Sequence, residues 1–278
     1  MIAVVPQGCY NSFIIYSNGV MVLSRIVFKV GTTTLTYSNG KLNLRRIEEL
    51  VRVLSDLANS GHEICLVTSG AIGVGVGKLG LSERPKDTAG KQAAATVGQC
   101  ELMFIYDKMF SEYDHKIGQL LITKKDIVDP ERHNNLVNTF NKLFDFKAIP
   151  IINENDAVAV EEIVFGDNDT LSAEVAVVVN ADKLIILTET DGLYDSNPQS
   201  NPNAKRISVV EHITDEIRSF AGDAISGLGT GGMITKIHAA EIATAQGIDT
   251  YIVSGSEPKI IYDLLDGTDI GTHFKAVK

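Results

Sequence analysis

Residues 25–70, RIVFKVGTTTLTYSNGKLNLRRIEELVRVLSDLANSGHEICLVTSG, contain one complete strand–helix–strand unit. The apolar runs at 25–30 and 64–68 predict two strands. Between them, residues 43–60 repeat apolar side chains at helical spacing and stop before Gly61, which predicts a helix. Two strands joined by a helix lie parallel in one sheet, so the unit indicates an α/β fold with helices covering the sheet.

The same alternation continues along the chain. We expect strands at 117–123, 148–153, 184–187 and 250–253, and helices at 91–110, 171–180 and 234–246. Residues 195–205 are rich in proline, asparagine and serine, which predicts a surface loop.

Composition excludes several classes of protein. A chain of 278 residues with 44% hydrophobic content can bury the core of one large α/β domain. Its formal net charge of −10 argues against non-specific binding to nucleic acid or anionic membranes. No apolar run reaches the roughly 20 residues of a membrane helix. Cys9, Cys65 and Cys100 have no metal-ligand spacing, which predicts reduced thiols, no bound zinc and a cytoplasmic location.

Residues 1–20 look unlike the rest of the chain, and Met21 directly precedes the first clear strand. They lack the basic region and cleavage pattern of a signal peptide. We interpret them as an extension of doubtful role, and an edge strand of the main fold is the alternative.

Two glycine-rich segments have the composition of phosphate-binding loops. Lys29 lies in the first predicted strand and is followed by Gly31 and three threonines. Residues 227–236, GLGTGGMITK, precede a predicted helix and end on Lys236. Glycines let N–H groups close on an anion, a helix N-terminus favours negative charge, and lysine adds a mobile cation. The pair predicts a phosphoryl group held from both sides, whereas a strand-end lysine and a surface loop are the alternatives.

Polar residues follow three other predicted strands. Ser69 and Gly70 form a turn rich in N–H groups, and Asp156 lies just beyond the strand at 148–153. Carboxylates suit an ammonium group, whereas amides and N–H groups suit a carboxylate, so this set predicts a site for a zwitterion. Thr188 and Glu189 follow the strand at 184–187, where a nucleotide is plausible and a plain turn is the alternative.

The segment GDND at 166–169 opens a predicted helix. Asn168 joins the zwitterion set, and Asp167 or Asp169 is expected to hold the two lysines in position. N-cap chemistry is the alternative for Asp169. A separate GxGxxG match at 75–80 starts several residues after a strand, which is the wrong place for a dinucleotide loop.

Together these motifs resemble those of the amino acid kinase family: KVGTTTL at 29–35, VTSGAI at 67–72, INENDAVA at 152–159, GDNDTLSA at 166–173 and SGLGTGGMITK at 226–236. The resemblance covers about residues 25–275, and its last two motifs are the most specific. It implies a three-layer αβα sandwich with a mostly parallel central sheet of about eight strands. It also implies a single kinase domain at 21–278, with the amino-acid substrate in the N-terminal half and ATP in the C-terminal half. The C-terminal PUA domain of many relatives is expected to be missing.

The resemblance assigns roles to individual residues. The catalytic lysines match Lys29 and Lys236, which Asp167 and Asp169 would position. The substrate-binding positions match Ser69, Gly70, Asp156 and Asn168. The ATP-binding positions match Lys29, Thr188, Glu189, Thr230, Gly231, Gly232, Met233, Ile234, Thr235 and Lys236. Relatives often have Thr-Asp where this chain has Thr-Glu, so Glu189 is the less secure of that pair.

The motifs at 152–159 and 166–173 favour one activity within the family: ATP-dependent phosphorylation of the γ-carboxylate of L-glutamate, the first step of proline biosynthesis. ATP as co-substrate and Mg²⁺ are implied. The implied partners are L-glutamate, proline as feedback inhibitor, a reductase that receives glutamyl phosphate, and further copies of the chain in a dimer or tetramer. Nucleic acid and membrane are not expected.

Three alternatives stay open. One is a sibling kinase whose acceptor is acetylglutamate, aspartate or a nucleoside monophosphate. Another is a sensor that binds ATP or proline without turnover, and the third is a dinucleotide-dependent oxidoreductase based on the GxGxxG match alone.

Overall fold

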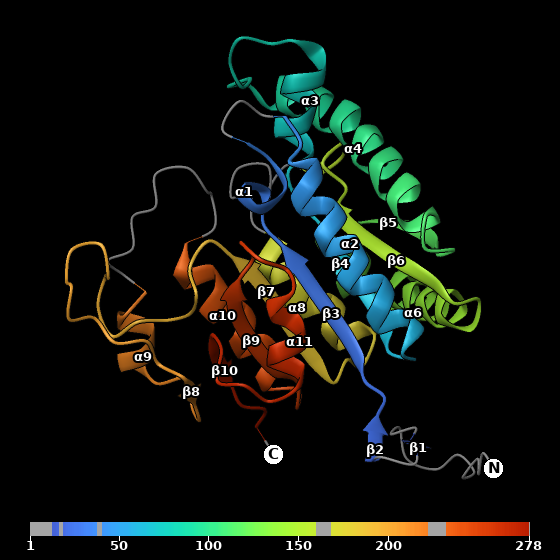
Figure 1. The fold of residues 1–278 in the computed structure, drawn as a ribbon. Coiled ribbons are helices and arrows are strands. Elements are labelled where there is room, and N and C mark those ends of the chain that lie inside the picture. Colours follow the sequence, from blue (N-terminus) through green and yellow to red (C-terminus); the bar gives the residue numbers. More distant parts are fainter. Residues whose placement is uncertain (1–12, 17–18, 38–40, 160–167, 222–231, 278) are drawn as a thin grey trace.

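An eight-stranded sheet forms the centre of the protein, in the order β5-β6-β4-β3-β7-β9-β10-β8 (Figure 1). The computed structural model describes residues 13–16, 19–37, 41–159, 168–221 and 232–277. The first six strands in this order, from β5 across to β9, pair in parallel with their neighbours. Strand β10 is antiparallel to β9 and parallel to β8. The strands are β3 (Arg25–Val30), β4 (Glu63–Val67), β5 (Lys116–Ile122), β6 (Ala148–Glu154), β7 (Lys183–Thr188), β8 (Val209–Val210), β9 (Asp249–Ser254) and β10 (Thr272–Phe274). The predicted mostly parallel sheet is confirmed.

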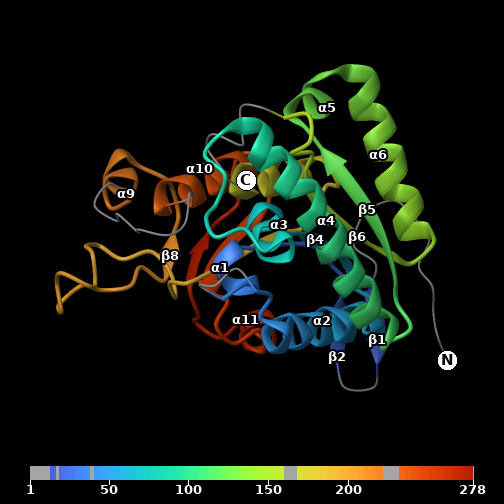
Figure 2. The same cartoon turned by 90° about the horizontal axis from the view of Figure 1, so that it is seen from above.

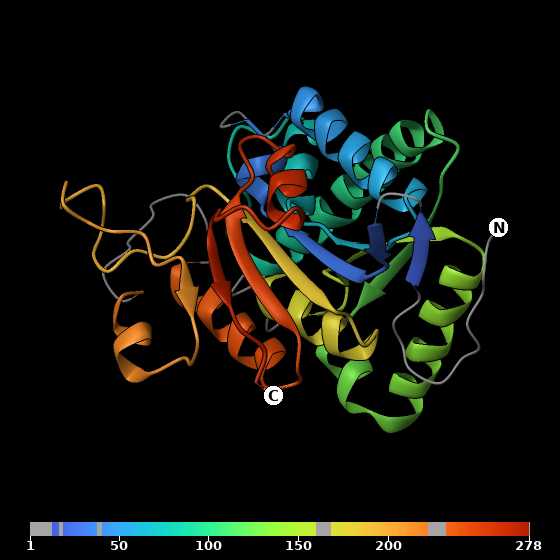
Figure 3. The same ribbon diagram turned by 60° about the horizontal axis from the view of Figure 1, so that its bottom comes forward.

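Helices cover both faces of the sheet, which completes the predicted three-layer sandwich (Figure 3). One face carries α2 (Leu44–Asn59), α3 (Ala71–Leu79), α4 (Thr88–Ser111) and α11 (Ile260–Leu265). The other carries α6 (Pro130–Asp145), α8 (Asn168–Val178) and α10 (Met233–Thr244). Shorter helices are α1 (Thr32–Leu35), α5 (Lys124–Val128) and α9 (Asp215–Ser219). Each helical layer and its face of the sheet enclose a separate hydrophobic core.

Strand β3 shows how the sequence places a lysine at the centre of the molecule. Ile26, Phe28 and Val30 lie in the core under α2 and α4, whereas Val27 lies in the core under α8 and α10. Side chains alternate between the two faces of a strand. Lys29, two residues after Val27, therefore faces α8 and α10, with its side chain buried.

The strand order also fixes where a ligand can bind. The chain passes from β3 to β4 on one side and later returns to β7 on the other side of β3. In parallel sheets, ligands bind at such a switch point, outside the carboxyl ends of the strands. Figure 2, seen from above Figure 1, shows α1 and α3 at this end of the sheet.

Most predicted elements are found, with shifted ends. Helix α4 begins at Thr88, three residues earlier than predicted, because the Asp87 side chain caps Gly90 N–H. Helix α8 begins at Asn168 rather than 171. The predicted loop at 195–205 is a turn-rich excursion closed by an antiparallel bridge between Tyr194 and Arg206.

Several elements were not predicted from the sequence, among them α3, α11 and β10. Another is α6, a sixteen-residue helix that begins with Pro130 and fully buries only Phe140. Strands β1 (Phe13–Tyr16) and β2 (Gly19–Val22) form their own antiparallel pair, so the described part of the N-terminal segment is not an edge strand of the main sheet. Cys65 and Cys100 are free thiols, and Cys9 lies outside the described residues. No helix among the described residues is long and apolar enough to span a membrane.

Candidate active site

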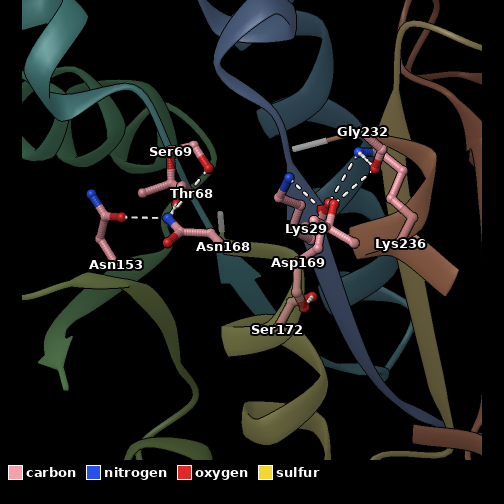
Figure 4. A network of polar contacts seen from close by, with 10 residues as sticks. Lys29, Thr68, Ser69, Asn153, Asn168, Asp169, Ser172, Gly232 and Lys236 are labelled. Carbon is pink, nitrogen blue, oxygen red and sulfur yellow. Dashed lines mark hydrogen bonds and ion pairs between the residues drawn. The ribbon is translucent and has the colours of Figure 1, made fainter. Parts of the chain in front are cut away.

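One buried carboxylate joins the two lysines singled out in the sequence (Figure 4). Asp169 Oδ1 lies 2.5 Å from Lys29 Nζ, and Asp169 Oδ2 lies 3.0 Å from Lys236 Nζ. Asp169 is fully buried, and each lysine is 6% exposed. Buried lysines need a partner charge, and one carboxylate here serves two ammonium groups. The geometry therefore fixes two positive charges, from β3 and α10, on either side of the start of α8.

The first turn of α10 is tied to the same carboxylate. Thr235 Oγ1 lies 2.9 Å from Asp169 Oδ2 and 2.8 Å from the Gly232 carbonyl oxygen. Gly232 is the N-cap of α10 and supplies no side-chain hydrogen bond to the first N–H groups of the helix. Uncapped N–H groups at a helix N-terminus attract anions. This end of α10 therefore adds N–H donors and a positive dipole beside the two lysines.

A second polar cluster surrounds the neighbouring residue, Asn168. Its Nδ2 donates to the Thr68 carbonyl oxygen at 2.6 Å and to Asn153 Oδ1 at 2.7 Å, and lies 3.3 Å from Ser69 Oγ. Because the two N–H bonds of the amide are directed to these acceptors, Oδ1 is left as the acceptor that Asn168 can offer a ligand. Asn168 and Asp169 are consecutive, so the acceptor cluster adjoins the lysine cluster.

The turn after β4 leads into α3 and is held by a contact to α4. Gly70 has φ +94°, a conformation that favours glycine, and forms the N-cap of α3 without a side-chain cap. Thr68 Oγ1 lies 2.9 Å from the hydroxyl of Tyr106, which is fully buried on α4. Burial raises the pKa of Tyr106, so its hydroxyl stays protonated and remains a hydrogen-bond donor. The first turn of α3 thus begins without a side-chain cap directly after Ser69, which contacts Asn168.

On the other side of β3, strands β7 and β9 end together. Thr188 is the last residue of β7, and its carbonyl oxygen accepts from Gly255 N–H at 2.7 Å. Glu189 is exposed directly after it. These residues border the lysine cluster on the side away from Ser69, since β7 and β4 flank β3.

The family assignment rests on the whole length of this fold. The sequence model described as "Amino acid kinase family" matches residues 24–254, well over half of the chain. The chain belongs to the amino acid kinase family. The sheet has the expected order of layers, and the two clusters of expected site residues lie at the carboxyl ends of its central strands.

Curated relatives of this amino acid kinase are similar along about nine-tenths of this chain. It is 54% identical over 259 residues to a glutamate 5-kinase of Clostridium perfringens (strain 13 / Type A), covering 91% of this chain and 96% of that protein. It is 50% identical over 254 residues to a glutamate 5-kinase of Caldanaerobacter subterraneus subsp. tengcongensis, covering 91% of this chain and 68% of that protein.

Solved structures support the fold alone, because their sequences are distant. A UMP kinase from Ureaplasma parvum superimposes with a TM-score of 0.64 at 15% identity, covering 92% of this chain and all of that one. A carbamate kinase from Giardia lamblia bound to AMP-PNP gives 0.62 at 17% identity, covering 92% and 99%.

The structure brings most of the predicted site residues of this kinase to one edge. Lys29, Asp169, Gly232, Thr235 and Lys236 form the lysine cluster, and Ser69 joins Asn168 in the second cluster. Asp156 lies in the turn that follows β6. Met233 and Ile234 begin α10, and the Ile234 side chain is half-exposed. Asp167, Thr230 and Gly231 lie outside the described residues.

Asn153 belongs to the polar segment 153–156 that was expected to help bind a zwitterion, but it was given no role of its own. Gln99, whose Oε1 accepts from Asn153 Nδ2, was not predicted, because it stands in an ordinary helical stretch without a motif. The GxGxxG match at 75–80 falls within α3 and its C-cap, Gly80, rather than in a strand-to-helix turn. That placement removes the basis of the oxidoreductase alternative.

Proposed function

We propose that this protein transfers the γ-phosphoryl group of ATP to the 5-carboxylate of L-glutamate, giving L-glutamyl 5-phosphate and ADP in the first step of proline biosynthesis. The observation that carries the proposal is Asp169 bridging Lys29 and Lys236 beside the open N-terminus of α10. The choice of glutamate is supported by 54% identity, over nearly the full length of both chains, to a glutamate 5-kinase.

The reaction needs no general base. A glutamate side chain has a pKa near 4.3, so it is ionised at neutral pH. One carboxylate oxygen forms a bond to the γ-phosphorus as the bond from that phosphorus to the β–γ bridging oxygen breaks, and ADP leaves with that electron pair. The difficulty is bringing two anions together, which is a matter of positioning and charge.

Lys29 and Lys236 supply the charge. Their ammonium groups face the transferred phosphoryl group and stabilise the negative charge on its oxygens in the transition state. Asp169 holds both ammonium groups at fixed positions, and Thr235 fixes Asp169 in turn. We assign Asp167 a share in positioning the lysines.

The acceptor end lies beside β4 and β6. Ser69 and the N–H groups at Gly70 bind a glutamate carboxylate, whereas Asp156 and Asn168 Oδ1 accept from the α-ammonium group. The adenine nucleotide lies beside β7 and α10, against Thr188, Glu189 and residues 230–236. The amino-acid substrate is thus bound mainly by the N-terminal half of a single kinase domain at 21–278, and ATP by the C-terminal half.

The described residues do not by themselves form a site for magnesium. Both oxygens of Asp169 contact lysines, and the described part of the chain contains no group of three histidine, cysteine or acidic side chains placed to hold a metal. Mg²⁺ commonly binds the phosphates of a nucleotide and keeps several waters. Mg²⁺ would arrive bound to ATP, and the roles given to Lys29, Lys236 and Asp169 require no protein ligand to the metal.

The direct test is ADP release from MgATP with four acceptors in parallel: L-glutamate, N-acetylglutamate, L-aspartate and UMP. Hydroxylamine in the assay traps an acyl phosphate as its hydroxamate. We expect ADP and γ-glutamyl hydroxamate to form in equal amounts when L-glutamate is the acceptor, and neither to form with the other three acceptors. Turnover with another acceptor would identify a sibling kinase, and ATP binding without turnover would favour the sensor.

Further proposals concern the surroundings of the reaction. Glutamyl phosphate hydrolyses readily, so we propose that it passes to a reductase, that proline inhibits at the glutamate site, and that the protein is a cytoplasmic dimer or tetramer. Titrating proline into the same assay tests the inhibition. Light scattering of the purified protein tests whether it is a dimer or a tetramer.

A further inference from the structure

Gln99 is a buried amide on α4 that the proposed mechanism does not use. Its side chain is 8% exposed, on a helix whose inward face is otherwise largely apolar. Gln99 Oε1 accepts a hydrogen bond from Asn153 Nδ2 at 2.7 Å. Its Nε2 is buried and has no hydrogen-bond partner among the described residues. Burying an amide group costs free energy unless its polar atoms form hydrogen bonds, and Gln99 forms a bond only through Oε1 among the described residues. A functional role would account for this cost.

The reason lies in the next two amides. Asn153 uses its Nδ2 toward Gln99, which leaves Asn153 Oδ1 to accept from Asn168 Nδ2 at 2.7 Å and from Glu154 N–H at 3.0 Å. If Asn153 were flipped, its NH₂ group would face the NH₂ group of Asn168, and its oxygen would face Gln99 Oε1. Both contacts would then be repulsive. The backbone N–H of Glu154, which can only donate, and the acceptor oxygen of Gln99 therefore together hold Asn153 in one orientation.

Asn153 in turn selects the orientation of Asn168. With Asn153 Oδ1 and the Thr68 carbonyl oxygen both accepting, Asn168 must direct its NH₂ group toward them. Its Oδ1 is then the atom that a ligand meets. An acceptor suits the α-ammonium group of an amino acid and repels a carboxylate.

The backbone around Gln99 is held at this place. A Cβ atom on its neighbour Gly98 would lie 1.8 Å from the Ala71 carbonyl oxygen, so α4 touches the first turn of α3 backbone to backbone. Ala71 directly follows Ser69 and Gly70. Gln99 thus stands on a rigid contact next to the acceptor cluster.

We infer that Gln99 is a positioning residue for the amino-acid substrate: through Asn153 it sets the Asn168 amide with its oxygen toward the α-ammonium group. This inference rests on the proposed function. Its effect is on discrimination, because an acceptor lacking the ammonium group gains nothing from the orientation of Asn168.

The test compares L-glutamate with glutarate, which has the same two carboxylates and no amino group. Gln99→Met keeps the length of the side chain and removes the acceptor. We expect the KM for glutamate to rise about tenfold, since a hydrogen bond to a charged group is lost. The inhibition constant of glutarate and the KM for ATP should stay within about twofold. Gln99→Glu keeps an acceptor oxygen and should restore most of the preference for glutamate.

Two controls distinguish an effect passed along the amide relay, Gln99–Asn153–Asn168, from a general loss of structure. Gln92→Met makes the same change on the same helix about two turns earlier, at a partly buried side chain, and should leave both constants unaltered. Asn168→Ala removes the end of the relay, so adding Gln99→Met to it should have almost no further effect on the KM for glutamate. Melting temperatures confirm that each variant is folded.

Equal weakening of glutamate and glutarate by Gln99→Met, or additive effects with Asn168→Ala, would overturn the inference and leave the proposed function intact. If Gln99→Met does not fold, loss of the glutamate preference in the folded Gln99→Glu variant would overturn it. Failure of the wild-type protein to phosphorylate glutamate would overturn the proposed function and this inference together.

Discussion

Asp169 joins β3 and α10 at the site through its two carboxylate oxygens. It contacts a lysine from β3, a lysine from α10 and the hydroxyl of Thr235, all within 3.0 Å. Breaking a buried ion pair by removing one partner is costly, because the other charge is left buried. Here a change of one lysine leaves the carboxylate paired with the other, so the fold can survive the loss of either cation.

Lys236→Ala should therefore separate catalysis from stability. We expect kcat to fall about 100-fold or more, as happens when a donor that stabilises transition-state charge is removed. The melting temperature should change by only a few degrees, because Lys29 still neutralises Asp169. Lys78→Ala, which removes an exposed ion pair with Glu101, is the matched control and should leave kcat unaltered. Near-normal turnover of Lys236→Ala would refute the assigned role.

At the scale of elements, the two glycines of the α3–α4 contact decide where the acceptor cluster lies. A Cβ on Gly75 would be 1.8 Å from the Ala94 carbonyl oxygen, and one on Gly98 equally close to that of Ala71. The helices consequently touch along their backbones. Larger side chains would push α4, with Gln99, away from the turn at Ser69.

Gly98→Ala should disturb this contact strongly. We expect a loss of about 3 kcal/mol or more in the free energy of unfolding, because a backbone atom cannot move aside as a flexible side chain does. The KM for glutamate should rise as well. Gly73→Ala lies on the same pair of helices with no atom within 4 Å of its Cβ, and should be neutral or stabilising by about 0.5–1 kcal/mol. Chemical denaturation of both variants measures the contrast, and equal stabilities would contradict it.

Elements were predictable where the pattern was strong. The six residues of β3 follow directly from an apolar run, and α2, predicted at 43–60 from its periodicity, is found at Leu44–Asn59 with Asn43 and Ser60 as its caps. Helix α6 was not predicted, although its sequence carries the same signal. Its apolar side chains recur at helical spacing and pack against the core at Leu136, Val137, Phe140, Leu143 and Phe144. Lys29 and Lys236 were predicted as a pair positioned by Asp167 or Asp169, and only the structure shows that Asp169 contacts both of them. The first contact of the amide relay, between Gln99 and Asn153, joins residues 54 positions apart in the sequence and has no local signal.

At the scale of the whole molecule, the site is assembled from both sides of β3. The two lysines lie on β3 and α10, and the polar cluster around Asn168 is formed by residues of β6, of α8 and of the turn after β4. All of them depend on the eight-stranded sheet being intact. The hairpin of β1 and β2 stands apart, because in the described part of the chain its strands pair only with each other.

A chain that starts at Met21 should therefore fold and work as the full chain does. Its removal of β1 and the first half of β2 breaks no described pairing with the main sheet. We expect a melting temperature within about 3 °C of the full chain, which corresponds to roughly 1 kcal/mol for a domain of this size, and an unaltered kcat. A chain that starts at Gly31 loses the central strand β3 and should not fold. A large loss of stability or activity in the first truncation would show instead that the hairpin belongs to the working domain.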